Sequence, residues 1–139
     1  MHRLPSVPRT PPLLDDSNRD FWTGGLSGEL RMWRCQACGW WVHPPAPVCR
    51  NCLSRELRTE VLSGRATVMG FTVNRHQWSP ETAPDPFVIA MVELDEQAGL
   101  RLTTNIVNCP PEAVSIGMRV RVVFEPLQDV AVPLFEPDV

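Results

Sequence analysis

The sequence contains no lysine and no tyrosine, so all of its basic residues are arginine. Basic residues are also fewer than acidic ones, 13 against 16, which gives a formal net charge of −3. A free-standing nucleic-acid binder usually carries a marked basic excess. The charge balance therefore argues against DNA or RNA as the main ligand.

Long apolar runs are absent as well. The chain has no stretch of about 18 apolar residues that could span a bilayer, and Met1-His2-Arg3-Leu4-Pro5 lacks the apolar run of a secretory signal. We expect a cytoplasmic protein with no membrane partner. Its hydrophobic content of 43% and charged content of 21% are those of an average globular chain, so most of the sequence should fold.

Four of the five cysteines form two C-x-x-C pairs that are ten residues apart, Cys35 with Cys38 and Cys49 with Cys52. Two tight turns can each present two sulfurs to one tetrahedral ion, and this double spacing favours zinc over disulfides or free thiols. Four thiolates leave no open position for water, so the predicted zinc is structural and not catalytic. Gly39 follows the first pair and can adopt a positive φ there.

Other reactive side chains are few. His43 lies between the cysteine pairs and is an alternative zinc ligand. Cys109 is a leftover thiol, and only His43 and His76 are available within the ordered region to activate it. The sequence also has no G-x-S-x-G, H-E-x-x-H or P-loop motif. We therefore expect no catalysis by this chain alone.

The chain divides into four predicted parts by composition. Residues 1–14 hold four prolines and form an extended arm, and residues 15–30 contain a short helix from Asp15 to about Ser27 that Gly24 and Gly25 end or loosen. Residues 31–61 form the cysteine ribbon, in which Glu56 to Val61 is a link. Residues 62–139 form a second lobe.

The second lobe contains five strand-like runs separated by turn residues, which suits a small barrel. The expected strands are Arg65–Asn74, Phe87–Asp95, Leu100–Val107, Met118–Glu125 and Val130–Phe135. Alternating side chains in the third and fourth runs indicate one buried face each. The continuously apolar run from Phe87 to Val92 predicts a strand covered on both sides, and Pro110 to Ile116 should add a helical turn.

Several of these segments together resemble the DUF35 family of zinc-ribbon and OB-fold proteins. The similarity covers the chain from about Asp15 almost to the C-terminus. It is carried by Phe21-Trp22, the two cysteine pairs with Pro44-Pro45-x-Pro47-Val48-Cys49, Ser63 to Val68, Pro86 to Asp95, Leu102 to Val107 and Gly117 to Pro126. The resemblance implies a mainly β protein with an N-terminal helical segment, a rubredoxin-like zinc ribbon and a C-terminal five-stranded OB-fold barrel.

The resemblance also implies a role. Members of this family look like accessory subunits or fused domains of thiolase-fold enzymes that act on acyl-CoA thioesters, some of them aldolases that remove the side chain of steroid CoA thioesters. We expect this chain to be such a noncatalytic subunit, in a heterotetramer with a partner dimer. Its barrel and helix would cover the partner near the substrate entrance.

Two groups of side chains bear on that role. Five aromatic residues crowd around the small ribbon and could either bind a partner or plug the helix against the ribbon: Phe21, Trp22, Trp33, Trp40 and Trp41. Five arginines could meet CoA phosphates, although spacing alone selects none of them: Arg31, Arg34, Arg50, Arg65 and Arg75.

Two other functions remain open. Zinc ribbons and OB barrels occur in nucleic-acid-binding proteins, where aromatic side chains stack on bases. A stand-alone acyl-CoA hydrolase or transferase would place His76 or Cys109 in its site. Salt-sensitive oligonucleotide binding would favour the first alternative, and thioester cleavage by the purified chain would favour the second.

Overall fold

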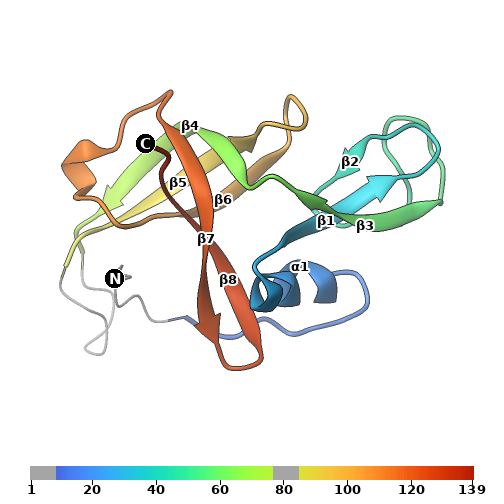
Figure 1. The fold of residues 1–139 in the computed structure, drawn as a ribbon, viewed down its shortest axis with the longest axis horizontal. Helices are drawn as coiled ribbons and strands as arrows, with labels where there is room; N and C mark the ends of the chain where they lie inside the picture. Colours follow the sequence, from blue (N-terminus) through green and yellow to red (C-terminus); the bar gives the residue numbers. More distant parts are fainter. Residues whose placement is uncertain (1–8, 77–84) are drawn as a thin grey trace.

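The computed structural model describes residues 9–76 and 85–139. It consists of a three-stranded ribbon sheet beside a closed five-stranded barrel, with a short helix packed below the junction (Figure 1). The prediction of a mainly β chain with an N-terminal helical segment is therefore confirmed. No helix in this part of the chain has the length and hydropathy needed to cross a membrane.

The helical segment is shorter than expected. Its α-helix α1 spans Arg19–Thr23, and the 3-10 helix η1 continues over Gly24–Ser27. A Cβ on Gly25 would lie only 2.3 Å from Cδ1 of Phe124, which is closer than real Cβ atoms approach. Because no side chain fits there, glycine lets η1 lie directly on the barrel, and the regular helix ends before it.

The ribbon sheet has β1 (Leu30–Cys35) at its centre, with β2 (Trp41–Val42) on one side and β3 (Leu57–Leu62) on the other. The prediction that residues 56–61 form a link was wrong. β3 pairs antiparallel with β1 along its whole length, from Leu30 opposite Leu62 to Cys35 opposite Leu57. This pairing comes from tertiary contact, which the mixed polar sequence of β3 does not reveal.

The barrel confirms all five expected strands, in the order β4-β5-β6-β8-β7 with β7 closing on β4. The strands are β4 (Arg65–Asn74), β5 (Phe87–Leu94), β6 (Arg101–Ile106), β7 (Arg119–Leu127) and β8 (Val130–Pro137). The expected helical turn is the 3-10 helix η2 (Pro111–Ala113). The alternating side chains of β6 face the core as predicted.

β5 corrects one expectation. Its inward side chains Val88, Ala90 and Val92 are at most 2% exposed, but Ile89 and Met91 on the other face are 38% and 41% exposed. The strand is therefore covered on one side by the described part of the chain, not on both. An ordinary half-buried strand alternates apolar and polar residues, so its outward side chains are polar. Ile89 and Met91 of β5 are apolar.

The ribbon and the barrel share one hydrophobic core and are joined by hydrogen bonds. Leu30, Met32 and Trp41 of the ribbon belong to the same buried cluster as the barrel side chains. Gln97, in the β5–β6 loop, accepts a bond from the Trp41 N–H at 2.8 Å and donates one to the Trp41 carbonyl at 3.0 Å. The side-chain amide of Gln97 thus makes the two hydrogen bonds to Trp41 that a neighbouring strand would make.

The connection between the two lobes depends on a glycine. Gly64 has φ +79°, and a Cβ there would lie 2.4 Å from Cγ1 of Val122. Only glycine tolerates both the left-handed backbone and the close approach. β3 can therefore run into β4 with a tight turn, as Figure 1 shows.

Candidate metal centre and the groove beside it

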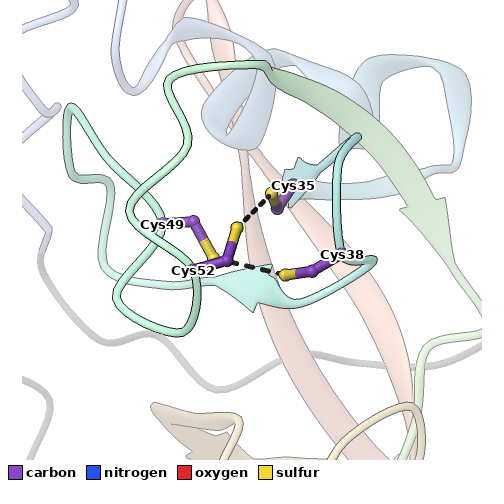
Figure 2. A group of neighbouring side chains, drawn as sticks. All are labelled: Cys35, Cys38, Cys49 and Cys52. Carbon is purple, nitrogen blue, oxygen red and sulfur yellow. Dashed lines mark hydrogen bonds between the residues drawn. The ribbon is translucent and has the colours of Figure 1, made fainter.

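The four predicted ligands converge at one end of the ribbon. Their sulfur atoms all lie within 4.8 Å of one another, and the Cys35–Cys52 and Cys38–Cys49 sulfur pairs are each 3.6 Å apart (Figure 2). The cysteines are free, as these separations require, since a disulfide bond is about 2.05 Å long. A tetrahedron with Zn–S bonds of about 2.3 Å has edges of about 3.8 Å. The donor set therefore fits a zinc ion without a large rearrangement.

The two cysteine turns are built alike. The Gly39 N–H donates to the Cys35 carbonyl at 2.9 Å, and the Leu53 N–H donates to the Cys49 carbonyl at 2.7 Å. Gly39 has φ +83° and Leu53 has φ +66°. Leu53 thus takes the left-handed conformation that glycine adopts in the first turn, although a Cβ makes this conformation costly.

The neighbouring sulfurs shift one another's pKa values in opposite directions. The side-chain amide of Asn51 donates to Cys38 at 3.4 Å and, with the Trp40 N–H, lowers the pKa of Cys38 to about 6. The Ser54 N–H lowers the pKa of Cys52, but the neighbouring sulfurs of Cys35 and Cys38 outweigh it and raise that pKa to about 12. Four thiolates this close together need a compensating cation, which is what a divalent metal supplies.

His43, the alternative ligand, has another role. Its ring stacks on Phe21 of α1 with a centroid distance of 5.1 Å and an interplanar angle of 28°. Burial lowers the pKa of His43, so the neutral ring is the favoured form in the folded chain. Within the described residues the candidate metal cluster consists of the four cysteines without His43.

The aromatic side chains divide between the two predicted roles. Phe21 packs on His43, and the Trp33 indole N–H donates to the Ser17 carbonyl before α1 at 2.6 Å. These two residues hold the helix against the ribbon. Trp41 is 5% exposed, with the guanidinium of Arg34 lying over its ring at 4.8 Å. Half-buried Trp22 instead lines a groove, described next.

The groove lies where the helix, the ribbon and the barrel meet. It has a volume of ≈ 710 Å³, within the usual range for small-molecule sites. Phe21 and Trp22 form one wall, His43 and Pro44 a second, and strands β5, β6 and β8 the remainder. Its walls are mainly apolar, and the two arginines among its lining residues, Arg9 and Arg101, pair with Glu125 at 3.1 Å and with Glu93 at 3.4 Å. Such a site suits an apolar body.

Arg9 anchors the proline-rich segment to the barrel beside this groove. Its Nε lies 3.1 Å from Glu125 Oε1, and its Nη2 donates to Asn105 Oδ1 at 2.8 Å. Asn105 in turn donates to the Val88 carbonyl at 2.8 Å. The other carboxylate oxygen of Glu125 is buried without a hydrogen-bond partner among the described residues. Sequence reasoning missed these residues, because Arg9 and Glu125 are 116 positions apart.

The arginines proposed for CoA phosphates are not in this groove. Arg31 pairs with Glu29, and Arg34 pairs with Glu60 at 3.3 Å. Arg50 lines a second hollow of ≈ 480 Å³ between the ribbon and the loop that holds Gln97. Arg65 and Arg75 are exposed on or next to β4. The two arginines that line the groove, Arg9 and Arg101, were not among those the sequence singled out, and each of them also pairs with a carboxylate.

The thiol proposed for stand-alone catalysis does not have the lowered pKa of a nucleophile. Cys109 packs against the core, and burial raises its pKa. A catalytic cysteine needs the opposite shift, because the thiolate is the nucleophile. His76 is exposed just beyond the end of β4.

A four-cysteine ribbon joined to a closed five-stranded barrel defines this chain as a zinc-ribbon and OB-fold protein. Two family models match it. The one described as "ChsH2, rubredoxin-like zinc ribbon domain" covers residues 22–58, and the one described as "ChsH2, C-terminal OB-fold domain" covers residues 59–125. The first contains all four clustered cysteines and so supports a structural zinc.

Similar proteins of known name include subunits and scaffolds. The "3-oxo-4,17-pregnadiene-20-carboxyl-CoA hydratase alpha subunit" of Mycobacterium tuberculosis is 38% identical over 125 residues, which cover 88% of this chain and 39% of that protein. A "DUF35 domain-containing scaffold protein" of Methanocaldococcus jannaschii is 36% identical over 97 residues, covering 69% of this chain and 67% of that one. The chain spans about two fifths of the length of the hydratase subunits that it matches.

A solved structure extends the similarity to the whole fold. The chain in "Ltp2-ChsH2(DUF35) aldolase" is 32% identical, with a TM-score of 0.81 over 93% of this chain and 100% of that one. Together these matches show that the chain belongs to the DUF35 family.

Proposed function

We propose that this chain is a noncatalytic accessory subunit that binds a thiolase-fold enzyme acting on acyl-CoA thioesters. The observation that carries the proposal is the match across the full length of the DUF35 component of an aldolase described with two components, Ltp2 and ChsH2. The scaffold name of the archaeal relative agrees with an assembly role. The raised pKa of Cys109 argues against chemistry by this chain alone.

In this proposal Cys35, Cys38, Cys49 and Cys52 hold one zinc ion that stabilises the ribbon and takes no part in the reaction. The ribbon matters because its His43 side chain and the following prolines form a wall of the groove. Loss of the metal would release that wall from the helix and the barrel. The metal therefore supports the binding surface and not the chemistry.

The groove is the place where this chain would contact the partner's substrate. An acyl group can lie against Phe21 and Trp22 in the groove. One relative is named for a pregnadiene-carboxyl-CoA and a similar solved structure is named an aldolase, so retro-aldol cleavage of a steroid-CoA is the first activity to test. We expect the complex to be a heterotetramer, in which two copies of this chain flank a partner dimer, and to reside in the cytoplasm.

The test is co-expression with any thiolase-like protein that is encoded beside this chain. A stable complex after size exclusion, together with aldol or thiolytic cleavage that needs both proteins, is the expected result. A Trp22→Ala variant should keep the complex and lose turnover of bulky substrates, because Trp22 lines the groove. Failure of every neighbouring thiolase-like protein to bind would remove the proposal.

Two assays on the isolated chain address the alternatives. Salt-sensitive micromolar binding to single-stranded oligonucleotides would establish a nucleic-acid role. Robust thioester cleavage that is lost in His76→Ala would establish a stand-alone enzyme. We expect neither activity, because the net charge is −3 and the Cys109 pKa is raised by burial.

A further inference from the structure

His43 is a polar side chain of the groove that makes no hydrogen bond to the described residues. Its ring is half-buried and stacks on Phe21, with the ring centroids 5.1 Å apart. In the described part of the chain, the buried side-chain polar atom without a partner is Glu125 Oε2 and not a nitrogen of His43. The two ring nitrogens therefore lack a protein partner and are reached by solvent.

The other polar side chains of the groove are less available to a ligand. Thr103 is exposed on β6, so water can bind its hydroxyl group. Five more make hydrogen bonds or ion pairs with described residues: Arg9, Asn18, Arg101, Thr104 and Asn105. A ligand would have to displace those partners, whereas His43 can bind it without losing a contact.

The position of the ring also favours the groove. His43 lies on the wall between the groove and the second hollow and lines both. Phe21 lines the groove and is not part of the second hollow. Because the ring of His43 stacks on Phe21, it lies on the groove side of this wall. Trp22 makes an edge contact with Phe21 at 5.0 Å and extends the apolar surface beside the ring.

The imidazole offers hydrogen bonds without a charge. Burial lowers the pKa of His43, so the neutral ring is the favoured form. A neutral imidazole has one N–H donor, which suits a carbonyl oxygen, and one acceptor nitrogen, which suits a hydroxyl group. The two lining arginines, Arg9 and Arg101, already pair with carboxylates. An anionic group would therefore lose its water without gaining an unpaired cation.

We propose that His43 hydrogen-bonds a neutral oxygen, of a ketone or a hydroxyl group, on an apolar ligand that lies in the groove. This inference rests on the proposed function and names the kind of acyl group that the site recognises, an apolar body that carries such an oxygen. The groove volume of ≈ 710 Å³ leaves room for a fused-ring body. His43 acts in binding and takes no part in making or breaking bonds.

The test compares three probes that share one bicyclic body: the ketone α-tetralone, the alcohol α-tetralol and the hydrocarbon tetralin. The substitution His43→Phe keeps an aromatic ring that can stack on Phe21 and removes both nitrogens. In NMR titrations of the zinc-loaded chain, it should raise Kd for the ketone and the alcohol about three- to tenfold, the range of one hydrogen bond. Its Kd for tetralin should stay within about twofold of the wild-type value.

Two controls separate a polar contact from a structural role. Trp22→Ala removes an apolar wall and should weaken binding of all three probes alike. In the wild-type chain, the NMR signals of the His43 ring nitrogens should move when α-tetralone is added and stay in place when tetralin is added. Circular dichroism and zinc content must match the wild type for both variants.

Four results would overturn the proposal. His43→Phe could weaken ketone and hydrocarbon binding equally, or the wild-type chain could bind none of the probes. The carboxylate of the same bicyclic body could bind more tightly than the ketone. Ketone affinity could be lost in Thr103→Val and kept in His43→Phe, which would assign the oxygen to β6.

The outcomes also separate this inference from the proposed function. A chain that binds α-tetralone through His43 and binds no thiolase-like partner overturns the proposed function and leaves the site in place. A chain that binds such a partner and shows no ketone effect in His43→Phe overturns the role of His43 alone.

Discussion

The two cysteine turns allow a test in which exchanging one residue should stabilise the protein. Leu53 has φ +66° and its side chain is 74% exposed, whereas Gly39 holds the matching position in the first turn with φ +83°. Leu53→Gly should therefore relieve backbone strain and lose little packing. Gly39→Ala should introduce the same strain where none exists now.

The magnitudes follow from the backbone. A left-handed residue with a Cβ costs about 1–2 kcal/mol, and the greater freedom of glycine in the unfolded chain returns about 0.5–1 kcal/mol. Leu53→Gly should thus raise the free energy of unfolding by about 0.5–1 kcal/mol, or Tm by about 2–4 °C for a domain of this size. A Cβ on Gly39 would lie 3.7 Å from Arg34 Nη2, an ordinary contact, so only the strain counts.

The assay is reversible thermal unfolding at a fixed free zinc concentration, because bound metal contributes to Tm by mass action. Gly39→Ala should lower the free energy of unfolding by about 1 kcal/mol. The reasoning fails if Leu53→Gly lowers Tm, since Leu53 would then contribute packing that its exposure does not show. It also fails if Gly39→Ala leaves Tm unchanged.

Three further perturbations address the junction between the arm, the helix, the ribbon and the barrel. Arg9→Met should lower the free energy of unfolding by about 3 kcal/mol, measured by urea denaturation. The variant leaves the Glu125 carboxylate, whose side chain is only 19% exposed, without its positive partner, and adding Glu125→Gln should restore part of the loss. Gln97→Ala removes both hydrogen bonds to the Trp41 backbone, so it should lower the free energy of unfolding by about 1–3 kcal/mol and speed amide hydrogen exchange at Trp41. Unchanged exchange at Trp41 would show that these two bonds do not hold β2 to the barrel. Burial lowers the pKa of His43 below its usual 6.5, so the unfolded chain binds the proton first and stability falls as pH drops through about 6.5. Comparing His43→Phe with the wild type at saturating zinc isolates this contribution, and identical pH profiles would contradict it.

The sequence predicted the barrel because each of its strands carries local signals. Turn residues separate the runs, and alternation in β6 and β7 marks the buried face. The cysteine cluster was equally accessible, since C-x-x-C spacing fixes which sulfurs can share one ion. Both features could be predicted because each of their signals lies within a few residues along the sequence.

Other features depend on contacts that local sequence does not encode. β3 is a strand because β1 pairs with it, although its residues Arg58 and Glu60 read as a polar link. The apolar run of β5 predicted cover on both faces, and this was wrong for the described part of the chain, because Ile89 and Met91 are 38% and 41% exposed. The division of the chain at residues 14, 30 and 61 stays a prediction, because the buried core runs from the ribbon into the barrel.

The most direct test of the central claim is the metal content of the purified chain. Elemental analysis should give about one zinc per chain, and each of Cys35→Ser, Cys38→Ser, Cys49→Ser and Cys52→Ser should lower that content and loosen the ribbon. Chelation should remove the metal and the ribbon structure together. A metal-free preparation that keeps its full fold and its partner affinity would contradict the claim that zinc holds the ribbon in the shape that binding requires.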